Sequence, residues 1–238
     1  MRKLWLLAAL VISLAGCGRA PAPAPAAGAP CDDRSLQPIA FTNPSGDTLT
    51  GYLAGTGSTG VLLANGVDAC SWRAYVHQLT DRGYRVLAFD YAEQTGGRGL
   101  VGEDVQAAAA YFRTVGAQGL VLIGASRGGA AVLAVASSIV PPVTAVVSLS
   151  GPAVYPGADA IAGVSTLSVP VLFVVGSQDT EFTGSAQMLY DATPGTQKKL
   201  VVIEGSAAHG QDLPLGGNSN SEANTAIFTF LDTYAKAA

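Results

Sequence analysis

The segment Leu120-Val-Leu-Ile-Gly-Ala-Ser-Arg-Gly-Gly129 decides the fold, because it joins a short apolar run to an Ala-rich stretch through a glycine-rich turn. Leu120–Ile123 predicts a strand, and Arg127–Ile139, which ends just before two prolines, predicts a helix. Between them, residues 124–128 match the pattern G-x-S-x-G. A β-carbon at either flanking glycine would collide with the neighbouring strand and helix. The pattern therefore predicts a tight turn that pushes the Ser126 hydroxyl out above the sheet, as a candidate nucleophile.

A serine hydroxyl needs a base within hydrogen-bond reach, and the chain has only two histidines. His77 falls inside an amphipathic helical stretch, which is typical of a histidine on a helix flank. His209 follows the last apolar run, in the segment Glu204-Gly-Ser-Ala-Ala-His-Gly210. The small residues around it leave the imidazole free to reach across the sheet, so His209 is the candidate base.

The base needs a carboxylate that fixes its tautomer and stabilises the imidazolium. Asp179 comes just after the apolar run Val171–Val175 and lies between Ser126 and His209 in the chain. Serine, then aspartate, then histidine is the order expected when such a nucleophile sits between a strand and a helix. We therefore expect Asp179 to be the acid, with Glu181 as the alternative. Two other aspartates are less suitable, because Asp159 lies in a preceding loop and Asp212 is too near His209 in sequence.

Alternation of strands and helices predicts a three-layer α/β sandwich, whose active sites lie beyond the carboxyl ends of the strands. An opening antiparallel hairpin is expected from Ile39–Thr42 and Leu49–Leu53 around an Asn-Pro-Ser-Gly-Asp turn. Short apolar runs typical of buried parallel strands follow at Val61–Ala64, Arg85–Phe89, Leu120–Ile123, Ala145–Leu149, Val171–Val175 and Leu200–Ile203. Helices are expected between them at Ser71–Arg82, Glu103–Val115, Arg127–Ile139, Ser185–Ala192 and Glu222–Ala235.

Together, the hairpin, the serine turn, the acid and the histidine resemble the α/β-hydrolase superfamily over nearly all of Ile39–Tyr234. Within it, the chain is most similar to small lidless esterases of the dienelactone-hydrolase and cutinase type. The resemblance implies a serine esterase that cleaves carboxylic esters through an acyl-enzyme. Ser126, His209 and Asp179 would form its triad, with no metal or organic cofactor.

The tetrahedral intermediate of such a reaction needs preorganised N–H donors for its oxyanion. The resemblance implies the backbone N–H of Arg127, next to the nucleophile, and that of Val67, in the loop Ala64-Asn-Gly-Val-Asp68. Many family members have His-Gly where this chain has Asn65-Gly66. The substitution leaves Val67 in place as the expected donor.

The substrate is expected to be a small or polymeric ester. Only about 20 residues separate Leu149 from Val171, too few for a substantial helical cap, which predicts a shallow, open site. Trp72, Tyr91 and Tyr155 either line this site or belong to the framework, and the sequence leaves both interpretations open.

The N-terminus indicates export. Arg2 and Lys3 precede the apolar run Leu4–Ala15, which is too short to span a bilayer comfortably and is typical of a signal peptide over residues 1–16. Its end, Leu14-Ala-Gly-Cys17, resembles a bacterial lipobox, which implies lipidation of Cys17 and an anchor on the periplasmic or cell-surface side of a bacterial membrane. The alternative is ordinary cleavage with Cys17 as an incidental thiol.

Residues 17–30 are expected to be the lipidated cysteine and a linker, in which the Pro- and Ala-rich residues 19–30 predict a semi-rigid spacer, so the folded hydrolase domain is expected at residues 31–238. With Cys17 lipidated, Cys31 and Cys70 remain in an oxidising compartment, where we expect a disulfide between them. Two unpaired thiols are the alternative.

Composition excludes several other classes of protein. The 238 residues carry a net charge of −4, which argues against nucleic-acid binding, and 49% are hydrophobic, which excludes disorder of the whole chain.

Two further functions stay open: a catalytically silent surface-binding lipoprotein, and perhydrolase or haloperoxidase chemistry on the same triad. We expect a monomer.

Overall fold

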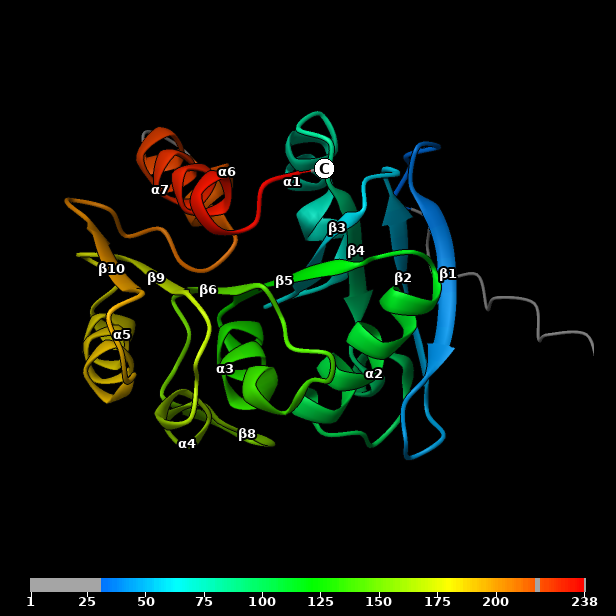
Figure 1. Ribbon diagram of the computed structural model, residues 1–238, viewed down its shortest axis with the longest axis horizontal. Coiled ribbons are helices and arrows are strands. Elements are labelled where there is room, and N and C mark those ends of the chain that lie inside the picture. The colour runs from blue at the N-terminus through cyan, green and yellow to red at the C-terminus, as the bar shows by residue number, and fades with distance from the viewer. Residues whose placement is uncertain (1–30, 217–218, 238) are drawn as a thin grey trace, which may run out of the picture.

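The computed structural model describes residues 31–216 and 219–237. Within them, an eight-stranded sheet has the order β1-β2-β4-β3-β5-β6-β9-β10, and β2 alone runs against the others (Figure 1). The strands are β1 (Gln37–Thr42), β2 (Thr48–Ala54), β3 (Thr59–Ala64), β4 (Arg85–Asp90), β5 (Gly119–Ala125), β6 (Ala145–Leu149), β9 (Val171–Gly176) and β10 (Lys198–Ile203). The predicted antiparallel opening hairpin and parallel sheet are confirmed.

Helices cover both faces of the sheet (Figure 1). One face carries α1 (Arg73–Thr80), α6 (Asp212–Leu215) and α7 (Ser219–Tyr234), and the other carries α2 (Val101–Thr114), α3 (Arg127–Val135), α4 (Ala160–Ser165) and α5 (Thr180–Ala192). Successive strand residues point to opposite faces, so Val61 and Leu63 join one core while Leu62 and Ala64 join the other. All four are fully buried, as expected of a central strand in a three-layer sandwich.

Some helix boundaries differ from those expected. Helix α5 begins at Thr180 rather than Ser185, because Asp179 takes the N-cap position and Gly184 is accommodated inside the helix. Helix α3 ends at Val135 and gives way to a short 3-10 turn, η3 (Ala136–Ser138).

The segment between β6 and β9 contains two elements that the sequence reasoning missed. They are a small hairpin, β7 (Val154–Tyr155) with β8 (Ala158–Asp159), and the short helix α4. Helix α4 lies directly on α3, because a β-carbon at Gly163 would fall 2.3 Å from the Leu133 carbonyl oxygen. This segment therefore packs beside α3 and builds no large helical domain.

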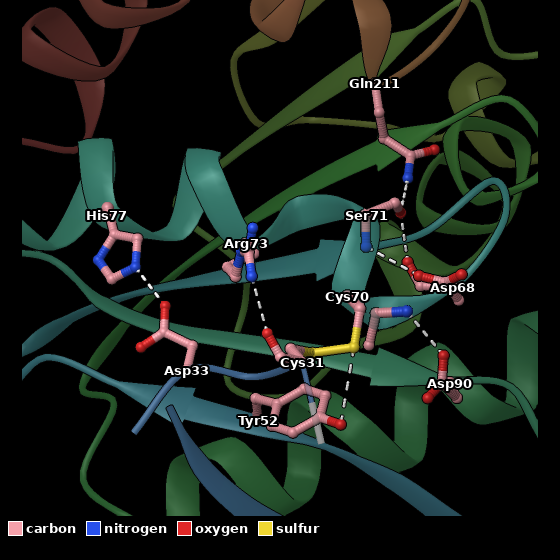
Figure 2. Close-up of a disulfide and its surroundings, with 11 residues drawn as sticks. Cys31, Asp33, Tyr52, Asp68, Cys70, Ser71, Arg73, His77, Asp90 and Gln211 are labelled. Atoms are coloured by element: carbon pink, nitrogen blue, oxygen red, sulfur yellow. Dashed lines mark hydrogen bonds and ion pairs between the residues drawn. A yellow bond between two sulfur atoms is a disulfide. The ribbon is translucent and has the colours of Figure 1, made fainter. Parts of the chain in front are cut away.

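The predicted disulfide is present: Cys31 is bonded to Cys70, with their Cα atoms 5.3 Å apart (Figure 2). Cys70 lies in the 3-10 turn η1 (Ala69–Trp72), which follows the loop after β3. The guanidinium of Arg73 also donates to the Cys31 carbonyl oxygen at 2.9 Å. The bond therefore fixes the start of the domain beside that loop.

The predicted signal peptide at residues 1–16, the lipidated Cys17 and the spacer at residues 17–30 lie outside the described residues. Across 31–216 and 219–237, no helix is both long and apolar enough to cross a membrane.

Candidate active site

Ser126 sits at the sharp turn between β5 and α3, as the sequence predicts. Its φ of 53° and ψ of −123° place a non-glycine residue in a strained backbone conformation. The Ser126 N–H donates to the Leu149 carbonyl oxygen at the end of β6, at 2.9 Å. The side chain consequently stands at the carboxyl edge of the sheet, at the N-terminus of α3.

Backbone crowding explains the two glycines that flank the serine. A β-carbon at Gly124 would lie 2.1 Å from the Gly128 carbonyl oxygen, and one at Gly128 would lie 2.2 Å from the Ala64 carbonyl oxygen in β3. Both distances are far below van der Waals contact, and both obstacles are backbone atoms. The predicted collision with strand and helix is confirmed.

Asp179 and His209 meet at the same edge. The Nδ1 atom of His209 lies 2.9 Å from Oδ2 of Asp179, whose side chain is 11% exposed. Asp179 caps α5 through its backbone only, so its carboxylate is available to the imidazole. Phe182, in the first turn of α5, packs against the histidine with ring centroids 4.3 Å apart. Carboxylate and phenyl ring together restrict the orientation of the imidazole.

The loops that carry the acid and the histidine are bonded to each other. The Gln178 N–H donates to the Ser206 carbonyl oxygen at 2.8 Å, and the Gly205 N–H donates to Ser177 Oγ at 2.9 Å. A β-carbon at Gly176 would come within 2.4 Å of the Ser206 oxygen, so the two loops are closely packed. The loops that carry Asp179 and His209 are thus fixed to each other by hydrogen bonds next to both residues.

The residue after the histidine packs against the serine turn. A β-carbon at Gly210 would lie 3.3 Å from the Ala125 β-carbon and 3.5 Å from the Ser126 nitrogen. Gly210 adopts a positive φ of 54°. The structure therefore brings the histidine loop to the turn that carries Ser126, although His209 and Ser126 are far apart in sequence.

His77 is placed elsewhere, on helix α1. Its Nε2 atom pairs with Oδ2 of Asp33 at 2.6 Å, near the start of the described chain (Figure 2). Hydrogen bonds from Ser35, and then from His77, lower the pKa of Asp33 to about 2. His77 thus has a local structural partner, which agrees with its interpretation as a helix-flank histidine.

The loop after β3 lies against the serine turn. A β-carbon at Gly66 would be 3.1 Å from the Ser126 β-carbon. The next residue, Val67, is 67% exposed at this edge. Arg127 is the first residue of α3, where backbone N–H groups have no acceptor within the helix. Arg127 directly follows Ser126, and Val67 follows the glycine that packs on Ser126, while their role as oxyanion donors stays a prediction.

The side chain of Arg127 has a part that the sequence did not reveal. It forms a close ion pair with Glu93, and its guanidinium lies 4.8 Å from the centre of the Tyr91 ring. It also donates to Asn65 Oδ1 at 3.3 Å and to the Val67 carbonyl oxygen at 3.4 Å. Arg127, which follows Ser126, thus also holds the loop after β3 by hydrogen bonds from its side chain.

Asn65, in the loop after β3, is completely buried. Its Nδ2 donates to the Phe89 carbonyl oxygen at 2.6 Å, which attaches the loop to β4. Asp90, at the end of β4, accepts from the Ala69 N–H at 2.7 Å. Burial raises the pKa of Asp90, against the opposing effects of this hydrogen bond and of the Arg127 charge. The loop is therefore tied to β4 at both of its ends.

The three aromatic residues left open by the sequence can now be placed. Trp72 and Tyr91 are fully buried, so they belong to the framework. Tyr155 is half-buried in β7 and packs on the core beneath α3. In the part of the chain that the structure describes, no group of three or more His, Cys, Asp or Glu side chains could hold a metal ion.

A serine on a strained strand-to-helix turn and an Asp–His pair at the same sheet edge define an α/β protein with a hydrolase-like site. Residues 61–219 match the model of the alpha/beta hydrolase family. The chain belongs to that family, which supports a hydrolase activity. No curated protein matches the sequence.

Solved structures share the fold at low sequence identity. The esterase domain of a Rhodothermus marinus protein matches with a TM-score of 0.68 and 22% identity, covering 84% of this chain and 98% of that one. An esterase from Pyrococcus furiosus has a TM-score of 0.68 and 17% identity, over 84% and 91%. A dienelactone hydrolase from Anabaena variabilis has a TM-score of 0.66 and 22% identity, over 84% and 99%. Similarity to α/β hydrolases, including a dienelactone hydrolase, is thus confirmed for the fold.

Proposed function

We propose that this protein is a serine esterase that cleaves carboxylic esters through an acyl-enzyme intermediate. Ser126 is the nucleophile, His209 the general base and Asp179 the residue that orients the histidine. The observation that carries the proposal is the 2.9 Å contact between His209 Nδ1 and Asp179 Oδ2 in a loop packed onto the Ser126 turn. A histidine held in this way by a largely buried carboxylate has one nitrogen committed and the other available for proton transfer.

In the first half of the reaction, Ser126 Oγ attacks the ester carbonyl carbon while His209 Nε2 takes the hydroxyl proton. Asp179 accepts the Nδ1–H, which selects the required tautomer and stabilises the imidazolium. When the tetrahedral intermediate collapses, the imidazolium gives its proton to the leaving alcohol. Ser126 is left esterified with the acyl group.

In the second half, water attacks the acyl-enzyme carbonyl carbon and His209 takes one of its protons. The bond to Ser126 Oγ then breaks, the serine recovers a proton from the imidazolium, and the carboxylic acid leaves. In both halves the carbonyl oxygen becomes an oxyanion, which the N–H groups of Val67 and Arg127 would stabilise. The positive end of the α3 dipole lies at the same place and adds to this stabilisation.

The first test removes each member of the triad. Ser126→Ala should abolish covalent labelling by a fluorophosphonate and lower ester hydrolysis by roughly 10⁴-fold or more, because no nucleophile remains. His209→Ala should cost a similar factor, and Asp179→Asn less, because the imidazole stays in place without its charge partner. The double variant Ser126→Ala/His209→Ala should be hardly worse than either single variant, since the residues act as one unit.

The matched control is His77→Ala, which removes the other described histidine together with its Asp33 partner contact and should leave turnover unchanged. Full labelling and turnover in Ser126→Ala would overturn the proposal. A wild-type protein that is neither labelled nor active on a panel of esters, thioesters and lactones would favour the catalytically silent binding protein instead. Oxidation of halide in the presence of peroxide and a carboxylic acid, without ester turnover, would favour the haloperoxidase alternative.

We also propose that lipidation of Cys17 anchors the domain to a bacterial membrane after export. The support is the signal sequence that ends at this cysteine, together with a disulfide of the kind that persists in oxidising compartments. Metabolic labelling with a fatty acid should mark the wild type and not Cys17→Ala, and the variant should lose its membrane association. Retention of the label by Cys17→Ala would contradict the anchor.

A further inference from the structure

Gln211 lies two residues after His209, at the start of α6, and its side chain is buried. From there the amide reaches to Gly66 in the loop after β3 and to Ser71 in η1, the second contact being drawn in Figure 2. The proposed reaction assigns no part to this residue. A buried side-chain amide that joins two active-site loops is therefore unexplained by the triad alone.

Both ends of the amide are used. Its Oε1 accepts the Gly66 N–H at 3.0 Å, and its Nε2 donates to the Ser71 hydroxyl oxygen. The Ser71 hydroxyl donates its own hydrogen bond to the Asp68 carbonyl oxygen, and the Ser71 N–H donates to Asp68 Oδ1 at 2.8 Å. Because Ser71 has a single hydroxyl proton, only a side chain that donates at one end and accepts at the other satisfies this arrangement.

Gly66 occupies the narrow space between this amide and the nucleophile. A β-carbon there would lie 2.8 Å from Gln211 Oε1 and 3.1 Å from the Ser126 β-carbon. Gln211 accepts a hydrogen bond from the Gly66 N–H and so fixes the peptide group before Gly66. The next peptide group, which carries the Val67 N–H, is therefore restricted in its orientation. On the other side, Gly210 packs on Ala125 and Ser126. Gln211 thus connects the histidine loop and the loop after β3 on either side of the serine turn.

We propose that Gln211 is a positioning residue, which sets the loop after β3 so that the Val67 N–H stands ready for the oxyanion formed at Ser126. This inference rests on the proposed esterase function. Its physical basis is that oxyanion donors act by being held in place before charge develops, so that a misplacement of about 1 Å costs on the order of 100-fold in rate. The effect of Gln211 should therefore appear in the transition state rather than in ground-state binding.

Two variants separate the ends of the amide. Gln211→Met keeps the approximate volume and removes both hydrogen bonds, whereas Gln211→Glu keeps an acceptor for the Gly66 N–H and gives up the donor to Ser71. We expect kcat of Gln211→Met to fall about 10- to 100-fold with KM within a factor of about two. Gln211→Glu should recover a large part of that loss. If Gln211→Met does not fold, Gln211→Ala, which also removes both hydrogen bonds, takes its place and should show the same loss of kcat, whereas Ser71→Ala keeps the Gly66 contact and should lose least.

A second readout follows the oxyanion itself. A trifluoromethyl ketone forms a tetrahedral adduct with a serine nucleophile and carries an oxyanion in its bound form. Its affinity for Gln211→Met should fall by the same factor as kcat/KM, because both report the same donor. If Gln211 only stabilised the fold, its substitution would change neither kcat/KM nor the affinity for the ketone in the folded protein.

The matched control is Asn43→Leu. Asn43 is also a buried amide, which accepts the Asp47 N–H at 2.9 Å and donates to Asp104 at 2.8 Å, in the turn between β1 and β2. This variant should lower the melting temperature and leave kcat unchanged. Equal losses of kcat in Asn43→Leu and Gln211→Met would mean general loosening, and an unchanged kcat in Gln211→Met beside an active wild type would remove the role of Gln211. Absence of both turnover and Ser126 labelling in the wild type would overturn the esterase function, and the Gln211 role with it.

Discussion

The serine turn and the loop after β3 lie side by side at the same sheet edge, yet they are held by different means. At the turn, Gly124 and Gly128 press backbone against backbone, with carbonyl oxygens of α3 and β3 in the space where β-carbons would be. Ser126 takes its strained conformation inside this packing. The position of the nucleophile thus follows from chain geometry, and few side chains are needed to define it.

The loop after β3 has no regular structure and depends on side chains from distant parts of the chain. Its peptide groups and side chains are bonded by Gln211, Arg127, Gln94 and Asp90, and by the Phe89 carbonyl oxygen. The Cys31–Cys70 disulfide fixes the turn that follows it. The comparison indicates that the backbone around Ser126, the proposed nucleophile, leaves no room for an added side-chain atom at Gly124 or Gly128, whereas the loop after β3, which carries the proposed oxyanion donor, is held by separate side-chain hydrogen bonds.

The largest effect is expected at the serine turn. Gly124→Ala places a β-carbon 2.1 Å from the Gly128 carbonyl oxygen, far inside van der Waals contact, and neither backbone can yield without moving β5 or α3. The cost should exceed the roughly 1–3 kcal/mol of ordinary overpacking, so the variant should accumulate poorly and lose nearly all activity. Thermal unfolding and fluorophosphonate labelling of the soluble fraction would measure both.

Gly184→Ala provides the control for this substitution. Gly184 lies inside α5, where a β-carbon would meet nothing within 4 Å. The same change of residue should there stabilise the protein by about 0.5–1 kcal/mol, because alanine loses less backbone entropy than glycine in a helix. A folded, active Gly124→Ala protein would contradict this prediction, because it would show that β5 or α3 can shift enough to accept the added β-carbon.

The same contrast explains how much the sequence could predict. Strands, the serine turn and the order of Ser126, Asp179 and His209 follow from local patterns and from the rule that strand ends gather at one edge. The structure confirms the sheet and brings Asp179 to His209, while their catalytic roles stay predictions. The predicted pairing of Cys31 with Cys70 needed only the export signal and a count of cysteines.

The contacts around the loop after β3 could not be predicted in this way. Gln211 and Gly66 are 145 positions apart, and nothing in the local sequence indicates that a glutamine near a helix start contacts the loop after β3. The backbone N–H of Arg127 follows from its place after Ser126, but the partners of its side chain lie 34 to 62 positions away and no local pattern marks them. Phe182 is predictable in principle, because it lies in the first turn of α5, which begins directly after Asp179.

The disulfide supplies the smallest expected effect on turnover and the sharpest comparison with Gln211. Closing a loop with a sequence separation of 39 residues should stabilise the fold by about 2–4 kcal/mol, mainly by restricting the unfolded chain. The double variant Cys31→Ser/Cys70→Ser should therefore unfold at clearly lower urea concentration. Its kcat at a temperature where it is fully folded should stay within about threefold of wild type, because the hydrogen bonds with Gln211, Asp90 and Arg127 still hold the loop.

Wild-type protein treated with a reductant is the control, and it should match the double variant in both stability and kcat. A loss of kcat as large as that of Gln211→Met, in protein shown to be folded, would mean that the covalent link rather than the side-chain contacts sets the oxyanion loop.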